Sequence, residues 1–170
     1  MDRLVARMVG AAGFSAGSYE DVESDHAASW PAVGVVLVSS MAAAIGVGAV
    51  DLHSVLGLLA VTIISWLIWV MLTLFIGTQL LPGKETKADF GEVLRTTGFS
   101  TSIGILRIFG FLPVIGRPIF LIVSVWMLLT FVIAIRQALD YSSTARAFAV
   151  CLLGWVIHGV VFFGFVRSMI

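Results

Sequence analysis

The chain has 170 residues, of which 59% are apolar and 12% charged, and its mean hydropathy is +1.07. Soluble domains carry about 25% charged residues, so this composition excludes a water-soluble globular protein and predicts an all-α integral membrane protein. Ten basic and ten acidic residues give a net charge of zero, which excludes a broad basic face and therefore nucleic-acid binding.

The first 29 residues predict an amphipathic helix that lies in the membrane interface. Five apolar residues fall on one side of a helical wheel, with Arg3 and Arg7 beside them: Leu4, Val5, Met8, Val9 and Ala12. An apolar face flanked by arginines is typical of interfacial helices. We therefore separate a cytoplasmic N-terminal segment, residues 1–29, from a membrane domain, residues 30–170.

The membrane domain is expected to be a five-transmembrane helix bundle. A helix needs about 20 mostly apolar residues to cross the hydrocarbon layer, and five segments qualify, at about 31–50, 55–81, 93–114, 119–136 and 147–167. The third contains Arg107 and stops at Pro113. It reaches full length because an amphipathic stretch precedes it, which Thr86 and Asp89 begin with the spacing of a capping box.

The distribution of arginine and lysine predicts a cytoplasmic N-terminus and an external C-terminus. Five crossings place seven basic residues on the side of the N-terminus and two, Arg117 and Arg167, on the other. Cytoplasmic segments carry the excess of Arg and Lys in membrane proteins. The seven are Arg3, Arg7, Lys84, Lys87, Arg95, Arg136 and Arg146.

Two ionisable residues within the expected spans are candidate functional residues, because a charge inside a membrane is costly. His158 near the middle of the fifth span is either a proton relay or ligand site, or a neutral histidine bonded to Ser65 or Thr130. Arg107 either extends its side chain to the outer interface or contacts an anion or lipid phosphate together with Arg117.

Charged residues at the cytoplasmic ends of the spans predict a basic rim. Arg136 and Asp140 are four residues apart on a continued helix and are expected to pair. The rim comprises Lys84, Lys87, Arg95, Arg136, Asp140 and Arg146, and it faces the acidic Glu20, Asp21, Glu23 and Asp25. An ordinary solvated surface, closure onto those acidic residues and docking of a partner all fit this pattern.

Small residues and tryptophans indicate how the spans pack. Small residues four apart, such as Ser40 with Ala44 and Ala42 with Gly46, let helix backbones approach closely, within the monomer or in a homo-oligomer. Trp30 is expected at the interface. Trp66, Trp69, Trp126 and Trp155 are expected in the bundle core.

The second half of the chain resembles the Yip1 domain family, particularly its short prokaryotic members. The resemblance rests on residues 88–95 (ADFGEVLR), 98–100 (GFS), 112–116 (LPVIG), Trp126 and 136–147 (RQALDYSSTARA). It implies five helices with a cytoplasmic N-terminus. Eukaryotic relatives have a long proline- and glycine-rich cytoplasmic region that this sequence lacks, so the resemblance favours the plasma membrane of a prokaryote over a role with small GTPases.

The sequence predicts a protein that is not an enzyme. We find no nucleophile with a base, no paired carboxylates and no metal-ligand spacing, and no cofactor is expected. We expect a scaffold, adaptor or membrane-organising factor of Yip1 type, whose partners are the lipid bilayer and a membrane protein or a second copy. Two alternatives remain, a small channel or transporter and an accessory subunit of a larger membrane complex.

Overall fold

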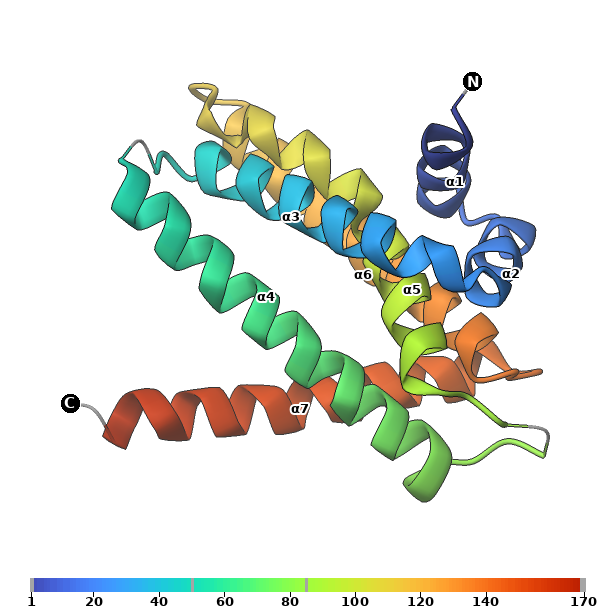
Figure 1. Cartoon of the computed structure of the whole chain (residues 1–170). Helices are drawn as coiled ribbons and strands as arrows, with labels where there is room; N and C mark the ends of the chain where they lie inside the picture. Colours follow the sequence, from blue (N-terminus) through green and yellow to red (C-terminus); the bar gives the residue numbers. More distant parts are fainter. Residues whose placement is uncertain (1, 50, 85, 169–170) are drawn as a thin grey trace.

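A computed structural model describes residues 2–49, 51–84 and 86–168, with side chains described as far as residue 159. All the regular structure in these residues is helical (Figure 1), which confirms the all-α prediction. The elements are α1 (Arg3–Ala12), α2 (Ala16–Ser24), η1 (His26–Ala28), α3 (Ser29–Gly46), α4 (Leu52–Phe75), η2 (Ile76–Leu80), α5 (Phe90–Ser100), η3 (Thr101–Phe111), α6 (Gly116–Ala138) and α7 (Thr144–Ser168).

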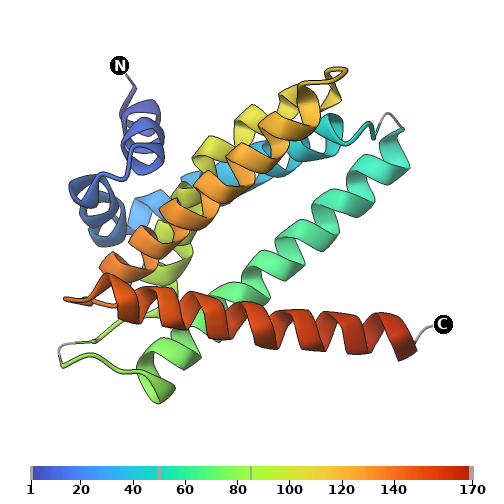
Figure 2. The ribbon, with the colours of Figure 1, turned by 180° about the vertical axis from the view of Figure 1, so that it is seen from behind.

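Five helical rods run in alternating directions between two ends of the molecule (Figures 1 and 2). They are α3, α4 with η2, α5 with η3, α6, and α7. One end, which we call the N-terminal end, holds α2 and the connections 81–89 and 139–143. The other, the far end, holds the connections 47–51 and 112–115. α7 diverges from the other rods toward its C-terminus.

Three described helices are long and apolar enough to cross a membrane: His26–Gly46, Leu52–Leu80 and Gly116–Ala138. They correspond to the first, second and fourth expected spans. The fifth is apolar over Thr144–Gly159, a shorter stretch of the described side chains. Large apolar side chains are exposed along α4 and α6, among them Leu56, Val61, Ile64, Leu121, Ile122 and Leu129. A lipid environment suits such outward faces.

The third expected span differs from the prediction of one continuous α-helix over residues 93–114. It is α-helical only to Ser100 and continues as the 3₁₀ segment η3. Successive hydroxyls at this junction donate to carbonyls three residues back, from Ser100 to Thr97 at 2.7 Å and from Thr101 to Gly98 at 2.7 Å. Hydroxyls that bond to the preceding turn compete with the α-helical ladder, and the tighter helix follows.

Small residues bring α3 and the α5–η3 rod into backbone contact. A Cβ added to Gly98 would lie 2.8 Å from the Cβ of Ala32, and one added to Gly46 would lie 2.0 Å from the carbonyl oxygen of Arg107. Ser40 and Ala42 are buried in the same helix. The small-residue spacing therefore serves packing within the monomer, as expected for spans that associate by close contact.

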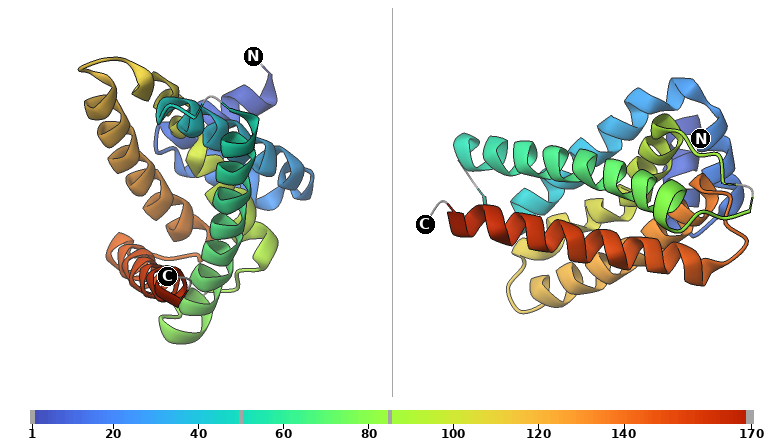
Figure 3. Two further views of the ribbon diagram at one scale, coloured as in Figure 1. Left: turned by 90° about the vertical axis from the view of Figure 1, so that its left-hand side faces the viewer. Right: turned by 90° about the horizontal axis from the view of Figure 1, so that it is seen from below.

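The N-terminal helices share their core with the bundle. Tyr19 and Val22 of α2 are fully buried together with Ala32 of α3 and Phe99 of α5. The Tyr19 hydroxyl lies 3.2 Å from the carbonyl oxygen of Thr130 in α6. The N-terminal helices, which the sequence analysis separates from the membrane domain, thus pack against its helices α3, α5 and α6. Figure 3 shows them beyond α4 in both views.

The tryptophans divide differently from the prediction. Trp66 and Trp69 are buried in the bundle, as expected, and Trp30 is exposed. Trp126 and Trp155, expected in the core, have exposed fractions of 39% and 52%. Trp126 instead faces α1, where its indole N–H donates to the Ala12 carbonyl at 2.9 Å and its ring stacks on Phe14 at 5.9 Å.

Replacing Gly46 by alanine is expected to destabilise the protein by about 1–3 kcal/mol, because the new methyl group would overlap a backbone carbonyl that has no room to retreat. Gly34→Ala is the matched control, since Gly34 lies in the same helix and a Cβ there meets nothing within 4 Å. The control should be neutral or stabilised by about 0.5–1 kcal/mol. Thermal unfolding in detergent measures both, and equal stabilities for the two variants would contradict the close approach.

Candidate functional site

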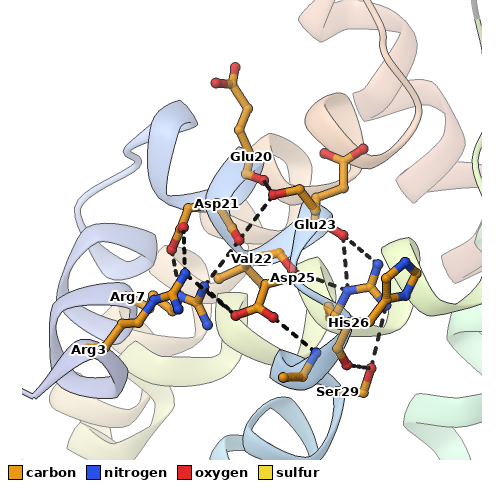
Figure 4. A network of polar contacts seen from close by, with 12 residues as sticks. Arg3, Arg7, Glu20, Asp21, Val22, Glu23, Asp25, His26 and Ser29 are labelled. Carbon is orange, nitrogen blue, oxygen red and sulfur yellow. Dashed lines mark hydrogen bonds and ion pairs between the residues drawn. The ribbon is translucent and has the colours of Figure 1, made fainter.

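The charged groups of α1 and α2 form an ion-pair network that fixes the two helices to each other (Figure 4). The buried Arg7 donates from Nε to a carboxylate oxygen of Asp21 at 2.6 Å and from Nη2 to Asp25 at 2.8 Å. Arg3 adds an exposed contact to Asp21 at 3.2 Å. In the part of the chain that the structure describes, the ion pairs all belong to this network.

This network satisfies two of the acidic residues that were expected to face the basic rim. The hydrogen bonds from Arg7 lower the pKa values of Asp21 and Asp25, and Asp25 also accepts from the Ala27 amide at the start of η1. In the described residues, Asp21 and Asp25 therefore pair with Arg7 and Arg3 and not with the rim. A signal for this pairing was present in the sequence, because Arg3 and Arg7 have the four-residue spacing of one helix face, and Asp21 and Asp25 have the same spacing.

Arg95 does not belong to the exposed rim, contrary to the prediction. It is 2% exposed and its guanidinium reaches from α5 to the end of α2. Nε donates to the carbonyl oxygens of Val22 at 3.2 Å and Glu23 at 3.1 Å, and Nη2 also contacts Glu23 O. The last carbonyls of a helix lack partners and attract a cation. Arg95 thus caps α2 from another helix, over a separation of about 70 residues that no local pattern reveals.

Glu23 lies among other carboxyl groups at this point. Burial, then the charges of Asp140 and Glu92, raise its pKa to about 7, and the nearby Arg95 opposes them. Glu20 on the same helix raises the pKa further and accepts a hydrogen bond from the Gln137 amide of α6 at 3.0 Å. The end of α6 therefore contacts α2 through the hydrogen bond from Gln137 to Glu20 and not through an ion pair.

The remaining rim residues lie around the connections at the N-terminal end. Lys84, Lys87, Asp140 and Arg146 are exposed and Arg136 is half-buried. Arg146 donates to the Pro82 carbonyl at 3.2 Å and lies over the Tyr141 ring, so the start of α7 is joined to the connection that carries both lysines.

The expected pair between Arg136 and Asp140 does not form. α6 ends at Ala138 and Asp140 adopts a left-handed conformation, with φ of 50°, so the two residues do not share a helix face. Arg136 instead donates to the Tyr141 carbonyl at 3.2 Å and to the Thr144 hydroxyl at 3.2 Å. It thereby holds the turn into α7.

The two candidates within the spans lie in different parts of the bundle. The ring of His158 stands edge-on to Trp69, with 6.3 Å between centroids. Its predicted partnership with Ser65 or Thr130 stays a prediction. Arg107 is half-buried in η3, donates to the Ser124 hydroxyl at 3.0 Å and lies 5.0 Å from the centroid of Phe120.

Comparisons with known proteins find no relative. No protein-family model matches the chain, and neither a curated protein nor a solved structure matches it. The described residues also contain no group of three or more His, Cys, Asp or Glu side chains placed to hold a metal ion.

Arg95→Ala is expected to lower the free energy of unfolding by about 2–3 kcal/mol, because it leaves the buried carbonyls of Val22 and Glu23 without donors. Hydrogen exchange of the α2 amides should accelerate as that helix loosens. Arg146→Ala, which removes an exposed arginine with one such bond, should stay within about 0.5 kcal/mol of the parent. Unchanged exchange in α2 would contradict the role of Arg95.

Stability is expected to fall as the pH rises from about 4.5 toward 8, because a carboxyl with a raised pKa holds its proton more tightly in the folded state. The contribution of Glu23 is complete below 4.5, its ordinary value, and is lost as the pH passes about 7. Asp21 and Asp25, whose pKa values are lowered, change the stability with pH only below about pH 4 and so do not contribute to this range.

Melting temperatures measured in detergent between pH 5 and 8 test this dependence. Glu23→Gln should flatten the curve, whereas Asp2→Asn, an exposed carboxyl removed from the same segment, should leave it unchanged. Identical curves for the parent and Glu23→Gln would rule Glu23 out as the source.

Proposed function

We propose that this chain is a non-enzymatic multi-pass membrane protein of Yip1 type that acts as a scaffold or adaptor in the plasma membrane of a prokaryote. In this proposal the five rods cross the bilayer, with the N-terminus in the cytoplasm and the C-terminus outside. The alternating directions of the rods support five crossings (Figure 1), and the apolar outer faces of α4 and α6 support their contact with lipid.

The observation that carries the adaptor role is the unequal distribution of charge between the ends. Among the described side chains, few charged or histidine residues belong to the far end or the rod leading to it: Asp51, His53, Arg107 and Arg117. The other charged residues and His26 lie at the N-terminal end, and His158 lies in α7. An end rich in charge extends beyond the hydrocarbon layer and is available to soluble or membrane partners.

The docking surface of the proposed adaptor consists of Lys84, Lys87 and Arg146, the exposed cations of the basic rim. All three are exposed, and within the described residues no carboxylate forms an ion pair with them. Asp89 and Glu92, which follow the two lysines, accept from each other's backbone amides in the capping box of α5, and Asp21 and Asp25 are engaged by Arg7. The basic rim therefore keeps its charge for an acidic segment of a partner, to which complementary potential gives specificity and a fast association rate.

Reversing the charge of the basic rim is expected to remove the partner. The Lys84→Glu, Lys87→Glu, Arg146→Glu variant should lose at least about tenfold of a membrane protein that copurifies in mild detergent, since like charges across an interface repel. His53→Glu adds negative charge at the far end and should retain the partner. Quantitative mass spectrometry of the purified samples measures both.

Three results would overturn the proposal. Recovery of one large assembly at fixed stoichiometry, insensitive to the reversed rim, would favour an accessory subunit. Solute flux through liposomes that His158→Ala abolishes would favour a channel or transporter. Reporters at the two termini that are accessible from the same compartment would exclude an odd number of crossings.

A further inference from the structure

The far end of the bundle contains a groove of about 440 Å³ beside the start of α6. The end of α3 forms one wall, with Gly46 and Val47, and Gly110 of η3 forms another. The first two turns of α6 complete the lining with Arg117, Phe120 and Leu121. The groove thus has mainly apolar walls and one cationic side chain, and Arg117 is exposed.

A second arginine lies directly behind this lining. The guanidinium of Arg107 covers the Phe120 ring at 5.0 Å, and the Arg107 carbonyl is in close contact with Gly46. Its Nη2 donates to Ser124 at 3.0 Å, while its Nε is fully buried and donates to no acceptor among the described residues. Because Nε is closed to the groove, Arg107 contributes its positive charge behind the lining and not this hydrogen bond.

No carboxylate neutralises this pair of arginines in the described part of the chain. Asp51, the acidic residue of the neighbouring connection, accepts from the Ser54 amide at 2.8 Å and caps α4. Neither Arg107 nor Arg117 forms an ion pair there. A half-buried guanidinium without an anion is unfavourable, because burial removes hydration that only a counter-charge or hydrogen bonds replace.

The backbone adds to the same positive potential. α6 begins at Gly116, has no acidic residue in its first turn and has no side-chain cap. The Gly116 and Ile119 amides already donate to the Leu112 and Ile115 carbonyls and Pro118 has no amide hydrogen, so the 23-residue helix attracts an anion through its dipole and not through a row of free amides. Arginine suits a phosphate group in particular, since its planar fork donates two parallel hydrogen bonds to two phosphate oxygens.

We propose that this groove binds a phosphate group, held by Arg117 on the groove wall and attracted by the positive charge of Arg107, which covers the Phe120 ring. A phospholipid headgroup and free phosphate share this chemistry. The apolar neighbours Val47 and Leu121 suit the acyl chains of a lipid, and the groove lies at the end of the rods, where headgroups meet a membrane protein. The site is independent of the basic rim, which lies at the opposite end of the bundle (Figure 1).

Native mass spectrometry of the full chain in detergent tests the site. The protein is incubated with phosphatidylglycerol or with diacylglycerol, which has the same chains without the phosphate. We expect phosphatidylglycerol to be retained and diacylglycerol not. Arg117→Gln should weaken retention about tenfold, and Arg107→Gln with Arg117→Gln should abolish it, as expected for the loss of charge-assisted bonds.

Arg146→Gln is the matched control, because it removes an exposed arginine at the opposite end and should bind lipid like the parent. Since Arg117 is exposed, its single variant keeps the test valid if the double variant fails to fold. Inorganic phosphate that binds with the same dependence on Arg117 while phosphatidylglycerol does not would assign the groove to free phosphate. Equal retention of diacylglycerol, or full retention by Arg117→Gln, would overturn the proposal.

Discussion

The close approach of α3 to the α5–η3 rod is the constraint on which the rest of the structure depends. At Gly46 and Gly98 the neighbouring atoms leave no room for a side chain. Because lipid supplies no hydrophobic force between helices, such contact between backbones is a main source of association within a membrane. It also positions the functional candidates, since η3 carries Arg107 to the far end and α5 carries Arg95 to the base of α2.

Among the described side chains, four arginines are buried or half-buried, and three of them, besides Arg136 at the turn into α7, are bonded in different ways. Arg7 has two carboxylates, Arg95 has helix-terminal carbonyls, and Arg107 has one hydroxyl and an aromatic ring. Arg7 joins α1 to α2 and Arg95 joins α2 to α5, and neither has a fully buried donor without an acceptor. Arg107 retains such a donor. Buried unsatisfied donors are uncommon in folded proteins, so Arg107 differs from the two arginines that hold the N-terminal helices.

The long apolar segments could be predicted from the sequence, because a membrane span is a local property of about 20 residues. The burial of individual charges could not. Arg95 looks like a rim residue until α2, about 70 residues earlier, is placed beside it. Local chemistry also shifted boundaries: the capping box expected from Thr86 and Asp89 lies three residues on, at Asp89 and Glu92, while the Thr86 hydroxyl donates to the Leu139 carbonyl at 2.8 Å.

At the far end, the sequence already offered one alternative in which Arg107 contacts an anion or lipid phosphate together with Arg117. The two arginines are ten residues apart and lie on either side of Pro113, so their spacing alone does not give the geometry of such a contact. The turn between η3 and α6 reverses the chain direction and brings the two arginines to the same aromatic ring. Arg107 covers Phe120, and Phe120 lines the groove together with Arg117. At the N-terminal end two carboxylates neutralise Arg7, whereas the far end has among its described side chains one carboxylate, Asp51, which caps α4. The proposed phosphate group would supply the missing negative charge there and accept hydrogen bonds from Arg117.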